Sequence, residues 1–238
     1  SDQPFEIHVI GTPSEESLDG GKNEMAAHGG FDHIDVAFMV HGSTLTQLET
    51  PSLALIEMDV EFHGKTAHAG IAPYAGRSAV DAVTMLQTGL GLMRNHLKDS
   101  SRVSNIVLAG GTAVNSVPDF AKVKVEIRHS SMAYLESVEQ WTREIAQAAA
   151  MATQTQVQIT PVAHIYNTTI NDAMGALLME CAEKFACDGI APPRKDCGST
   201  DFGAVTHRLP SCCLRVKTVE TDDPPHTDAW VKTGKEAR

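Results

Sequence analysis

Two adjacent carboxylates are the first residues in the sequence whose types and spacing could do chemistry. Glu15 and Glu16 end the stretch G-T-P-S-E-E, which follows a short apolar run at residues 5–10. If that run is a strand of a parallel sheet, both carboxylates lie at its carboxyl end, where open α/β sheets bind their ligands. One carboxylate could then hold a metal ion while its neighbour transfers a proton. A Glu-Glu pair alone more often begins a solvated helix, so this hypothesis needs partners elsewhere in the chain.

Two histidines are candidate partners. His41 follows the apolar run I-D-V-A-F-M-V, and His226 stands in the loop sequence D-D-P-P-H-T-D. Neutral imidazole is the commonest protein ligand of transition metals, so either residue could bind such an ion. Taken singly, a histidine after a strand is more often a surface residue or one that supports a ligand, and the loop around His226 could be an ordinary stiff turn.

A polar loop near the end of the chain is a candidate substrate-binding segment. Gly198, Ser199 and Thr200 open the stretch G-S-T-D-F-G, which precedes an apolar run. Backbone N–H groups of such a loop could surround a substrate, and a helix N-cap at Ser199 or Thr200 is the equally good alternative.

Three polar residues in the middle of the chain complete the candidates. His68 lies in F-H-G-K-T-A-H-A-G, Asn115 in G-G-T-A-V-N-S-V-P, and Arg128 closes A-K-V-K-V-E-I-R. Polar groups that converge at strand ends would suit an oxyanion or a substrate carboxylate. Each of them alone would pass as a surface residue.

The elements that must position the middle residues follow from periodicity. Alternation and short apolar runs predict strands at residues 54–62, 103–109, 121–128 and 156–160, and apolar residues three and four positions apart predict helices at 78–97 and 135–152. The order β-α-β-β-α-β is that of the ferredoxin-like fold, an antiparallel four-stranded sheet with two helices on one face. We expect this unit to span residues 53–166.

The flanking segments predict a different kind of sheet. Nearly continuous apolar runs at residues 5–10, 34–40 and 211–216 are typical of strands covered on both faces in a parallel sheet. A helix is expected at 172–186, with an apolar face formed by Met174, Leu177, Leu178, Cys181 and Phe185. The predicted fold is therefore an α/β domain of residues 1–52 and 167–238, interrupted by the ferredoxin-like unit.

Composition narrows the class of protein. The 238 residues are 42% hydrophobic and 21% charged, as in soluble globular chains, and 19 basic against 30 acidic residues give a net charge of −11 that disfavours nucleic acid. Neither an apolar run of about 18 residues nor a signal-peptide pattern is present. We therefore expect a cytoplasmic protein without a membrane partner. Five cysteines without a C-x-x-C motif predict buried free thiols.

The motifs, taken in order, resemble those of the di-metal aminoacylase and carboxypeptidase family of amidohydrolases. The similarity covers nearly the whole chain and includes M-V-H-G at His41 and P-H-T-D-A-W at His226. Within that family, the G-S-T-D-F-G stretch and a histidine at position 41 are most similar to the branch of aminobenzoyl-glutamate hydrolase and the β-alanyl-lysine dipeptidases.

The resemblance implies a role for each matching residue. Glu15 matches the general base, whereas Glu16, His41 and His226 match ligands of the metal site. Two divalent ions are implied, zinc first, with manganese or cobalt as alternatives. Such ions lower the pKa of water and polarise the carbonyl of a small N-acyl amino acid or dipeptide, and a carboxylate not bound to metal accepts the proton.

The resemblance also implies a homodimer. The ferredoxin-like unit matches the dimerisation or lid domain of the family, whose histidine reaches the partner subunit's site. His68, assisted by Asn115, would then stabilise the oxyanion in trans, and Arg128 would hold a substrate carboxylate. Gly198, Ser199 and Thr200 remain the segment expected to contact substrate.

The sequence departs from the family pattern at its beginning. Members of the family carry an H-x-D or C-x-H metal-binding motif upstream, and neither motif precedes Glu15 here. We expect a chain that is truncated at its N-terminus. Part of the metal site, and with it the ions, would then be absent from this chain. The alternative is a non-catalytic dimeric binding or assembly protein with an incomplete metal site. A serine hydrolase is excluded, because no G-x-S-x-G elbow is present.

Overall fold

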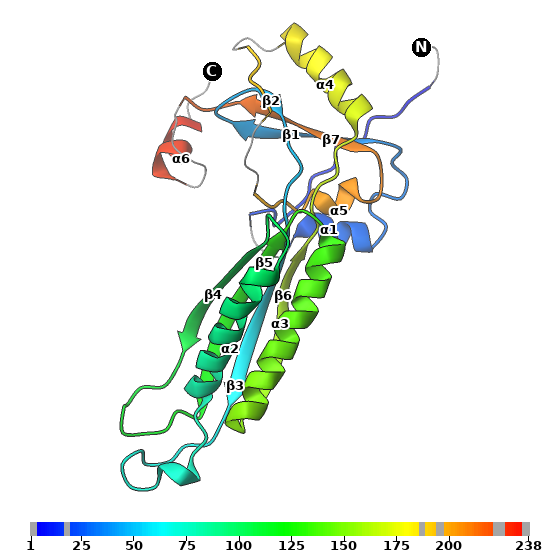
Figure 1. The fold of residues 1–238 in the computed structure, drawn as a ribbon. Coiled ribbons are helices and arrows are strands. Elements are labelled where there is room, and N and C mark those ends of the chain that lie inside the picture. The colour runs from blue at the N-terminus through cyan, green and yellow to red at the C-terminus, as the bar shows by residue number, and fades with distance from the viewer. Residues whose placement is uncertain (1–3, 17–19, 186–188, 194–197, 221–226, 235–238) are drawn as a thin grey trace.

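The computed structural model describes residues 4–16, 20–185, 189–193, 198–220 and 227–234. Within this part of the chain, a four-stranded sheet with two long helices forms one end of the molecule, and a three-stranded sheet forms the other end (Figure 1). The predicted α/β class with a ferredoxin-like unit is confirmed. The division of the chain at residues 53 and 166 stays a prediction.

The larger sheet is antiparallel throughout, with strand order β4-β5-β3-β6. Helices α2 and α3 cover one of its faces (Figure 1). The elements of this unit are β3 (Ala54–His63), α2 (Ala79–Met93), β4 (Arg102–Ala109), β5 (Phe120–His129), α3 (Met132–Thr153) and β6 (Gln156–Ile165), with short 3-10 turns at Pro73–Ala75 and Arg94–His96.

Alternating residues build the core of this unit, because successive side chains of a strand point to opposite faces of the sheet. Val123, Val125 and Ile127 of β5 are fully buried against Phe62 and Leu86. Burying a side chain of this size stabilises the fold by about 1.5–3 kcal/mol. A serine stands immediately before each helix and caps its N-terminus. Before α2, the serine hydroxyl oxygen accepts the backbone N–H of the residue three positions further on at 3.2 Å, and the corresponding hydrogen bond before α3 is 3.4 Å long.

The opposite face of this sheet is charged. Lys122 lies 2.6 Å from the Asp59 carboxylate and 3.0 Å from that of Glu61, and Lys124 lies 2.8 Å from Glu57. Hydrogen bonds to Asp59 and Glu61 raise the pKa of Lys122, and a hydrogen bond to Glu57 raises the pKa of Lys124. Cross-strand pairs of opposite charge therefore follow the alternation that predicted these two strands.

The last strand of the unit is longer than predicted. The predicted strand stopped before Pro161, because proline cannot donate to a sheet, yet β6 continues to Ile165. β6 is an edge strand, and the register shifts between Glu57 and Met58 of the neighbouring β3. An edge position with a bulge tolerates the missing N–H group, which explains the difference.

The smaller sheet has the order β1-β7-β2. Its parallel pair, β1 (Ala37–Ser43) with β7 (Ser211–Lys217), confirms two of the three predicted parallel strands, and β2 (Gln47–Leu48) is antiparallel to β7. The helices at this end are α1 (Gly21–Ala27), α4 (Asp172–Phe185), α5 (Gly203–Thr206) and α6 (Asp228–Gly234). None of the described helices combines the length and apolarity needed to cross a membrane.

Two expectations for the flanks are wrong. Residues 5–10 form no strand, and Phe5, Ile7 and Val9 are 80%, 80% and 96% exposed. Among the described strands none pairs with this segment, so no hydrogen-bonded neighbour fixes it as a strand. The edge strand β1 is also open on one face, since Phe38 and Val40 are 48% and 68% exposed instead of covered.

The predicted apolar face of α4 is correct only in part. α4 packs against β7 and β2 through Met174, Gly175 and Ala182, whereas Leu177 and Phe185 are 51% and 80% exposed. Small residues set this contact, because a side chain at Gly175 would meet Leu48 of β2.

The prediction of buried free thiols is correct only in part. Cys212 and Cys213 are buried and free, Cys181 is free but exposed, and Cys187 and Cys197 lie outside the described residues.

Candidate functional site

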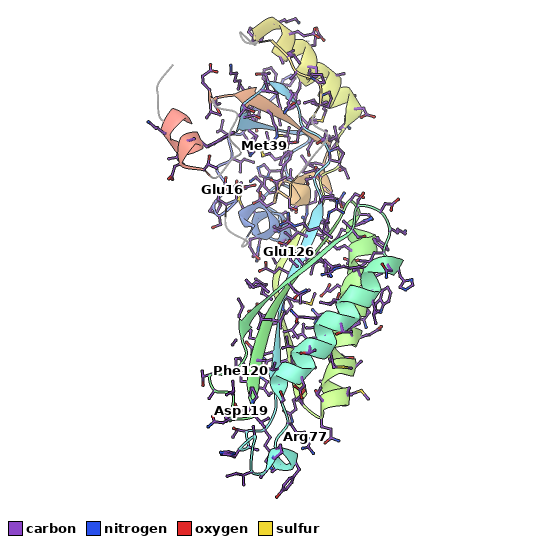
Figure 2. The ribbon with its side chains drawn as sticks, turned by 60° about the vertical axis from the view of Figure 1, so that its left-hand side comes forward. Glu16, Met39, Arg77, Asp119, Phe120 and Glu126 are labelled. Carbon is purple, nitrogen blue, oxygen red and sulfur yellow. The ribbon has the colours of Figure 1, made fainter. Side chains whose placement is uncertain are left out.

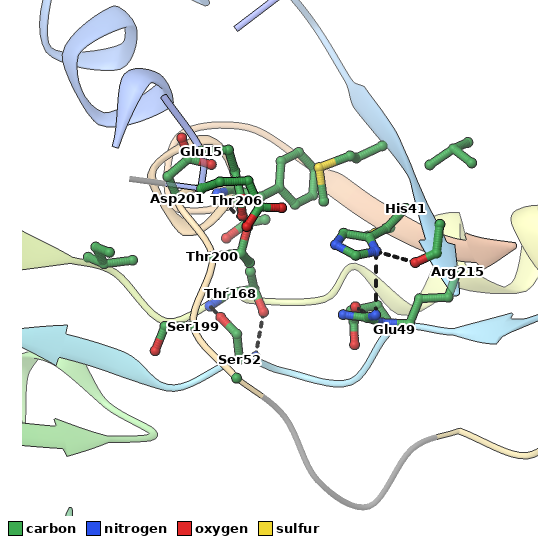
Figure 3. A pocket seen from close by; sticks show the side chains of 18 of the residues that line it. Glu15, His41, Glu49, Ser52, Thr168, Ser199, Thr200, Asp201, Thr206 and Arg215 are labelled. Atoms are coloured by element: carbon green, nitrogen blue, oxygen red, sulfur yellow. Dashed lines mark hydrogen bonds and ion pairs between the residues drawn. The ribbon is translucent and has the colours of Figure 1, made fainter. Parts of the chain in front are cut away.

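Residues from both sheets line a cavity of about 870 Å³. The cavity collects most of the predicted site residues, although they come from segments far apart in the sequence (Figure 3). The predicted residues that line it are Glu15, Glu16, His41, Arg128, Gly198, Ser199 and Thr200. His226 lies outside the described residues.

His68 and Asn115 do not reach this cavity within the chain. They lie in the loops 64–78 and 110–119, where the Ala69 amide donates to the Asn115 carbonyl at 2.9 Å. These loops join the strand ends remote from the smaller sheet, as the labelled Arg77 and Asp119 show (Figure 2). β5 runs from that end to Arg128 beside the cavity, and at about 3.3 Å per residue it spans roughly 30 Å.

Thr200 links the polar loop to the first carboxylate. Its hydroxyl donates to Oε1 of Glu15 at 3.0 Å and accepts the Phe202 N–H at 3.3 Å. The alternative of a helix N-cap at Thr200 is observed in part: the Thr200 hydroxyl and carbonyl accept the N–H groups of Phe202 and Gly203 in the turn that leads into α5, whereas Phe202, directly before α5, makes no side-chain cap. Ser199 lines the cavity with a buried hydroxyl oxygen that finds no hydrogen-bond partner among the described residues.

A buried ion pair that periodicity did not indicate anchors the same loop. Lys22 Nζ donates to Oδ1 of Asp201 at 2.7 Å, and the Lys22 backbone N–H donates to Oδ2 at 3.0 Å. Lys22 is 8% exposed and Asp201 2% exposed. The two residues are 179 positions apart, so no local pattern in the sequence could pair them. The one feature that could have drawn attention to Lys22 is its place directly after the two glycines at the start of α1.

His41 is oriented by its own strand. It lies inside β1, not after a strand that ends at Val40 as predicted, and its Nδ1 is 2.6 Å from the Gly42 carbonyl oxygen. A carbonyl can only accept, so Nδ1 carries the proton and Nε2 keeps the lone pair that a metal ion would use. The nearby Arg215 nitrogen, at 3.4 Å from Nδ1, can only donate and is therefore a neighbour of this ring, not its partner.

Arg215 belongs instead to a second buried ion pair in the cavity wall. Its Nε donates to the carboxylate of Glu49, and the two side chains are 13% and 10% exposed. Burial, reinforced by the nearby Glu49 carboxylate, raises the pKa of Cys213 to about 12. The thiol is therefore protonated and unreactive at neutral pH. Neither Glu49 nor Arg215 was singled out from the sequence, because 166 positions separate them.

The donor set that the described residues offer fits part of a metal site. Glu16 and His41 line the same cavity and supply a carboxylate and an imidazole, which suit Zn²⁺, Mn²⁺ or Co²⁺. Across the residues that the structure describes, no group of three or more His, Cys, Asp or Glu is arranged to hold an ion. A site would therefore need a ligand from outside this set, such as His226.

Arg128 lies in the cavity wall with its charge already paired. Nε and Nη2 donate to the two carboxylate oxygens of Glu126 at 2.7 and 2.9 Å. The guanidinium is one-third exposed, at 32%, so a substrate carboxylate would share or displace Glu126. The fork of N–H groups is suited to either partner.

The two chain segments that join the sheets are bonded to each other in this wall. The Ser52 amide donates to the Thr168 hydroxyl at 2.6 Å, and the Thr168 amide donates to the Ser52 hydroxyl at 2.9 Å. Both residues are buried, and the Leu53 amide donates to the Gly198 carbonyl at 2.9 Å. The loop that carries Thr200 is thus connected to both segments (Figure 3).

Comparison with known proteins places the chain among amidohydrolases. Residues 54–154 match the peptidase dimerisation domain of the M20 type. The Xaa-Arg dipeptidase of Mus musculus is 32% identical over 87% of this chain and 49% of its own length. One of the p-aminobenzoyl-glutamate hydrolase chains of Escherichia coli (strain K12) is 32% identical over 71% of this chain and 36% of its own length.

Solved structures agree on the fold. An aminobenzoyl-glutamate utilization protein from Klebsiella pneumoniae superposes with a TM-score of 0.75, at 24% identity, over 87% of this chain and 56% of that protein. The chain spans about half the length of the curated relatives that it matches, 49% for the dipeptidase. The dimerisation domain, these relatives and the shared fold agree with one another: the chain belongs to the M20 family of amidohydrolases.

Proposed function

We propose that the chain is part of a metal-dependent hydrolase that cleaves the amide bond of a small N-acyl amino acid or dipeptide. The observation that carries this proposal is the cavity, which collects Glu15, Glu16, His41 and Arg128 beside the 198–200 loop. The names of the relatives, a dipeptidase and an aminobenzoyl-glutamate hydrolase, support amide hydrolysis as the reaction class.

Each residue has one proposed role. Glu16, His41 and His226 would hold a divalent ion, which supplies a Lewis acid and a water of lowered pKa when bound. Glu15 accepts a proton from the attacking water and passes it to the leaving amine. Arg128 binds the substrate carboxylate, which takes the place of Glu126 on the guanidinium.

We further propose that the active form is a homodimer, with His68 and Asn115 acting in the partner subunit's site. The span of roughly 30 Å along β5 supports action between subunits, because these residues are too remote from their own cavity. Large apolar residues surround them at the tip: Ile71, Tyr74 and Val114 are 76%, 82% and 102% exposed. A second copy covering this tip would remove apolar surface from water.

The first test replaces the general base in the full-length protein. Glu15→Gln keeps the size and one oxygen acceptor but cannot take a proton, so kcat should fall by about 100-fold or more while bound metal is unchanged. Glu180→Gln is the matched control, since Glu180 is an exposed carboxylate of α4 that pairs with Lys184, and it should leave kcat unchanged.

Removal of metal is the second arm of the same test. Exhaustive chelation should abolish hydrolysis of N-acyl amino acids and dipeptides, and added Zn²⁺, Mn²⁺ or Co²⁺ should restore it. Full activity after chelation, or in Glu15→Gln, contradicts the proposal. A full-length protein that neither binds metal nor hydrolyses any of these substrates would support the alternative, a non-catalytic dimeric binding protein.

A further inference from the structure

We infer that Thr200 is a positioning residue for the carboxylate of Glu15, and that the buried pair of Lys22 with Asp201 holds Thr200 in place. The inference rests on the proposed function, because it assigns the support of the proposed general base. It also gives Thr200 a different task from the substrate contact that the sequence predicted.

The direction of the Thr200 hydroxyl is determined by its two neighbours. A hydroxyl has one proton to donate and lone pairs to accept. The Phe202 N–H occupies a lone pair at 3.3 Å, and Oε1 of Glu15 at 3.0 Å is an acceptor. The proton therefore points at the carboxylate, and a hydrogen bond to a charged acceptor is about twice as strong as a neutral one.

The ion pair ties together the two segments that this hydrogen bond joins. Asp201 directly follows Thr200, and Lys22 stands in the first turn of α1, shortly after Glu15 (Figure 3 shows the loop). The pair makes two contacts, at 2.7 and 3.0 Å, with the Asp201 carboxylate almost fully buried. Because the second contact involves the Lys22 backbone, the pair fixes the start of α1 and not only a side chain.

This arrangement suits the task of a general base. With Oε1 bonded to Thr200, rotation of the Glu15 carboxylate is restricted and Oε2 remains for the proton that moves between water and the leaving amine. A general base must lie within hydrogen-bond reach of that proton, and a displacement of about 1 Å can cost on the order of 100-fold in rate. A residue that fixes the base therefore affects turnover more than substrate affinity.

The experiment compares three threonine variants of the full-length, metal-loaded enzyme. Thr200→Val has nearly the same shape without the hydroxyl, and kcat should fall about 10-fold with KM unchanged. Thr200→Ser retains the hydroxyl and should recover most of that loss. Thr142→Val is the matched control: it removes a fully buried hydroxyl that bonds Val138 within α3, and it should leave kcat unchanged.

Three kinetic outcomes would overturn the inference: equal losses in Thr200→Val and Thr200→Ser, a rise in KM with kcat unchanged, or no effect of Thr200→Val at all. The second of these would instead support substrate binding by Thr200. Wild-type enzyme without amidase activity would overturn the proposed function, which is a different result from any of the three.

A second readout needs neither metal nor activity. In metal-free protein, a double-mutant cycle of Thr200→Val and Glu15→Ala, which removes the acceptor, on the unfolding equilibrium constant should show a coupling of about fivefold. Additive effects of the two substitutions would mean that the contact contributes nothing, and would overturn the inference whatever the kinetics show.

Discussion

Replacing Lys22 with methionine removes a buried positive charge and leaves its partner in place. Asp201 is 2% exposed, so its carboxylate cannot turn to water in the folded protein. Methionine matches the length of the lysine stem, and the substitution therefore tests the charge without opening a large cavity.

The expected loss of stability follows from the contacts that remain. Removing one partner of a buried ion pair costs about 3–5 kcal/mol, because the other charge is left uncompensated. Here the Lys22 backbone N–H still donates to Oδ2 of Asp201 at 3.0 Å in the variant. One of the two contacts survives, so we expect the lower limit of that range, about 3 kcal/mol.

Amide hydrogen exchange measures this loss where it should occur. The amides of α5 at residues Ala204 to Thr206 begin three positions after Asp201, whose carbonyl accepts the Ala204 N–H, and should exchange about 100-fold faster in Lys22→Met, since about 1.4 kcal/mol is a factor of ten. Amides of α3, which belong to the other core, should exchange at the wild-type rate and serve as the internal control.

The double variant Lys22→Met/Asp201→Asn refines the test. Asparagine keeps an oxygen that can accept the Lys22 backbone N–H, and the site then holds no charge, so exchange in α5 should return to within about tenfold of wild type. Acceleration below about fivefold in Lys22→Met, or equal acceleration in α3, would refute the argument that this pair anchors the loop.

Two further predictions concern the cavity thiol and the dimer. Because folding raises the pKa of Cys213 from 9.0 to about 12, the folded thiol keeps a proton that the unfolded one loses, so unfolding free energy should fall above pH 9 by up to about 1.4 kcal/mol per pH unit. Equilibrium unfolding at pH 8 to 11 measures this slope, and a slope as steep in Cys213→Ala would contradict the assignment. Co-expressing Glu15→Gln with His68→Ala, each inactive alone, should restore about a quarter of wild-type activity, since half of the dimers are mixed and each has one complete site. An inactive mixture that is shown to contain mixed dimers would contradict action between subunits.

Helices and strands were predicted best from the sequence where the spacing of apolar residues reflects a single buried face. The alternation at residues 121–128 predicted β5, because the even-numbered residues lie on the charged face of the sheet and the odd-numbered residues lie in the core. Residues 5–10 have an equally apolar sequence, but a strand also needs a hydrogen-bonded neighbour, and periodicity says nothing about neighbours. In α4 the predicted Met174 is buried, but the close approach to β7 and β2 occurs at Gly175, a residue too small to signal an apolar face.

The site was predicted from residue types, and its supporting contacts were not. Glu15, Glu16 and His41 stood out because carboxylates and imidazoles near apolar runs suggest metal chemistry, and all three line the cavity. The pairs that hold the wall, Lys22 with Asp201 and Glu49 with Arg215, join residues 179 and 166 positions apart. Charged residues of this kind are mostly exposed in proteins, so their burial becomes apparent only when the chain is folded.

The exchanged hydrogen bonds between Ser52 and Thr168 have a mechanical consequence. The chain passes between the two sheets twice, and these bonds fasten the two passages to each other at a buried point. Twisting one passage separately would break both bonds, so the two passages move together at this point. The Leu53 bond to Gly198 ties the loop that carries Thr200 to the same point, so a displacement of either passage is transmitted to that loop.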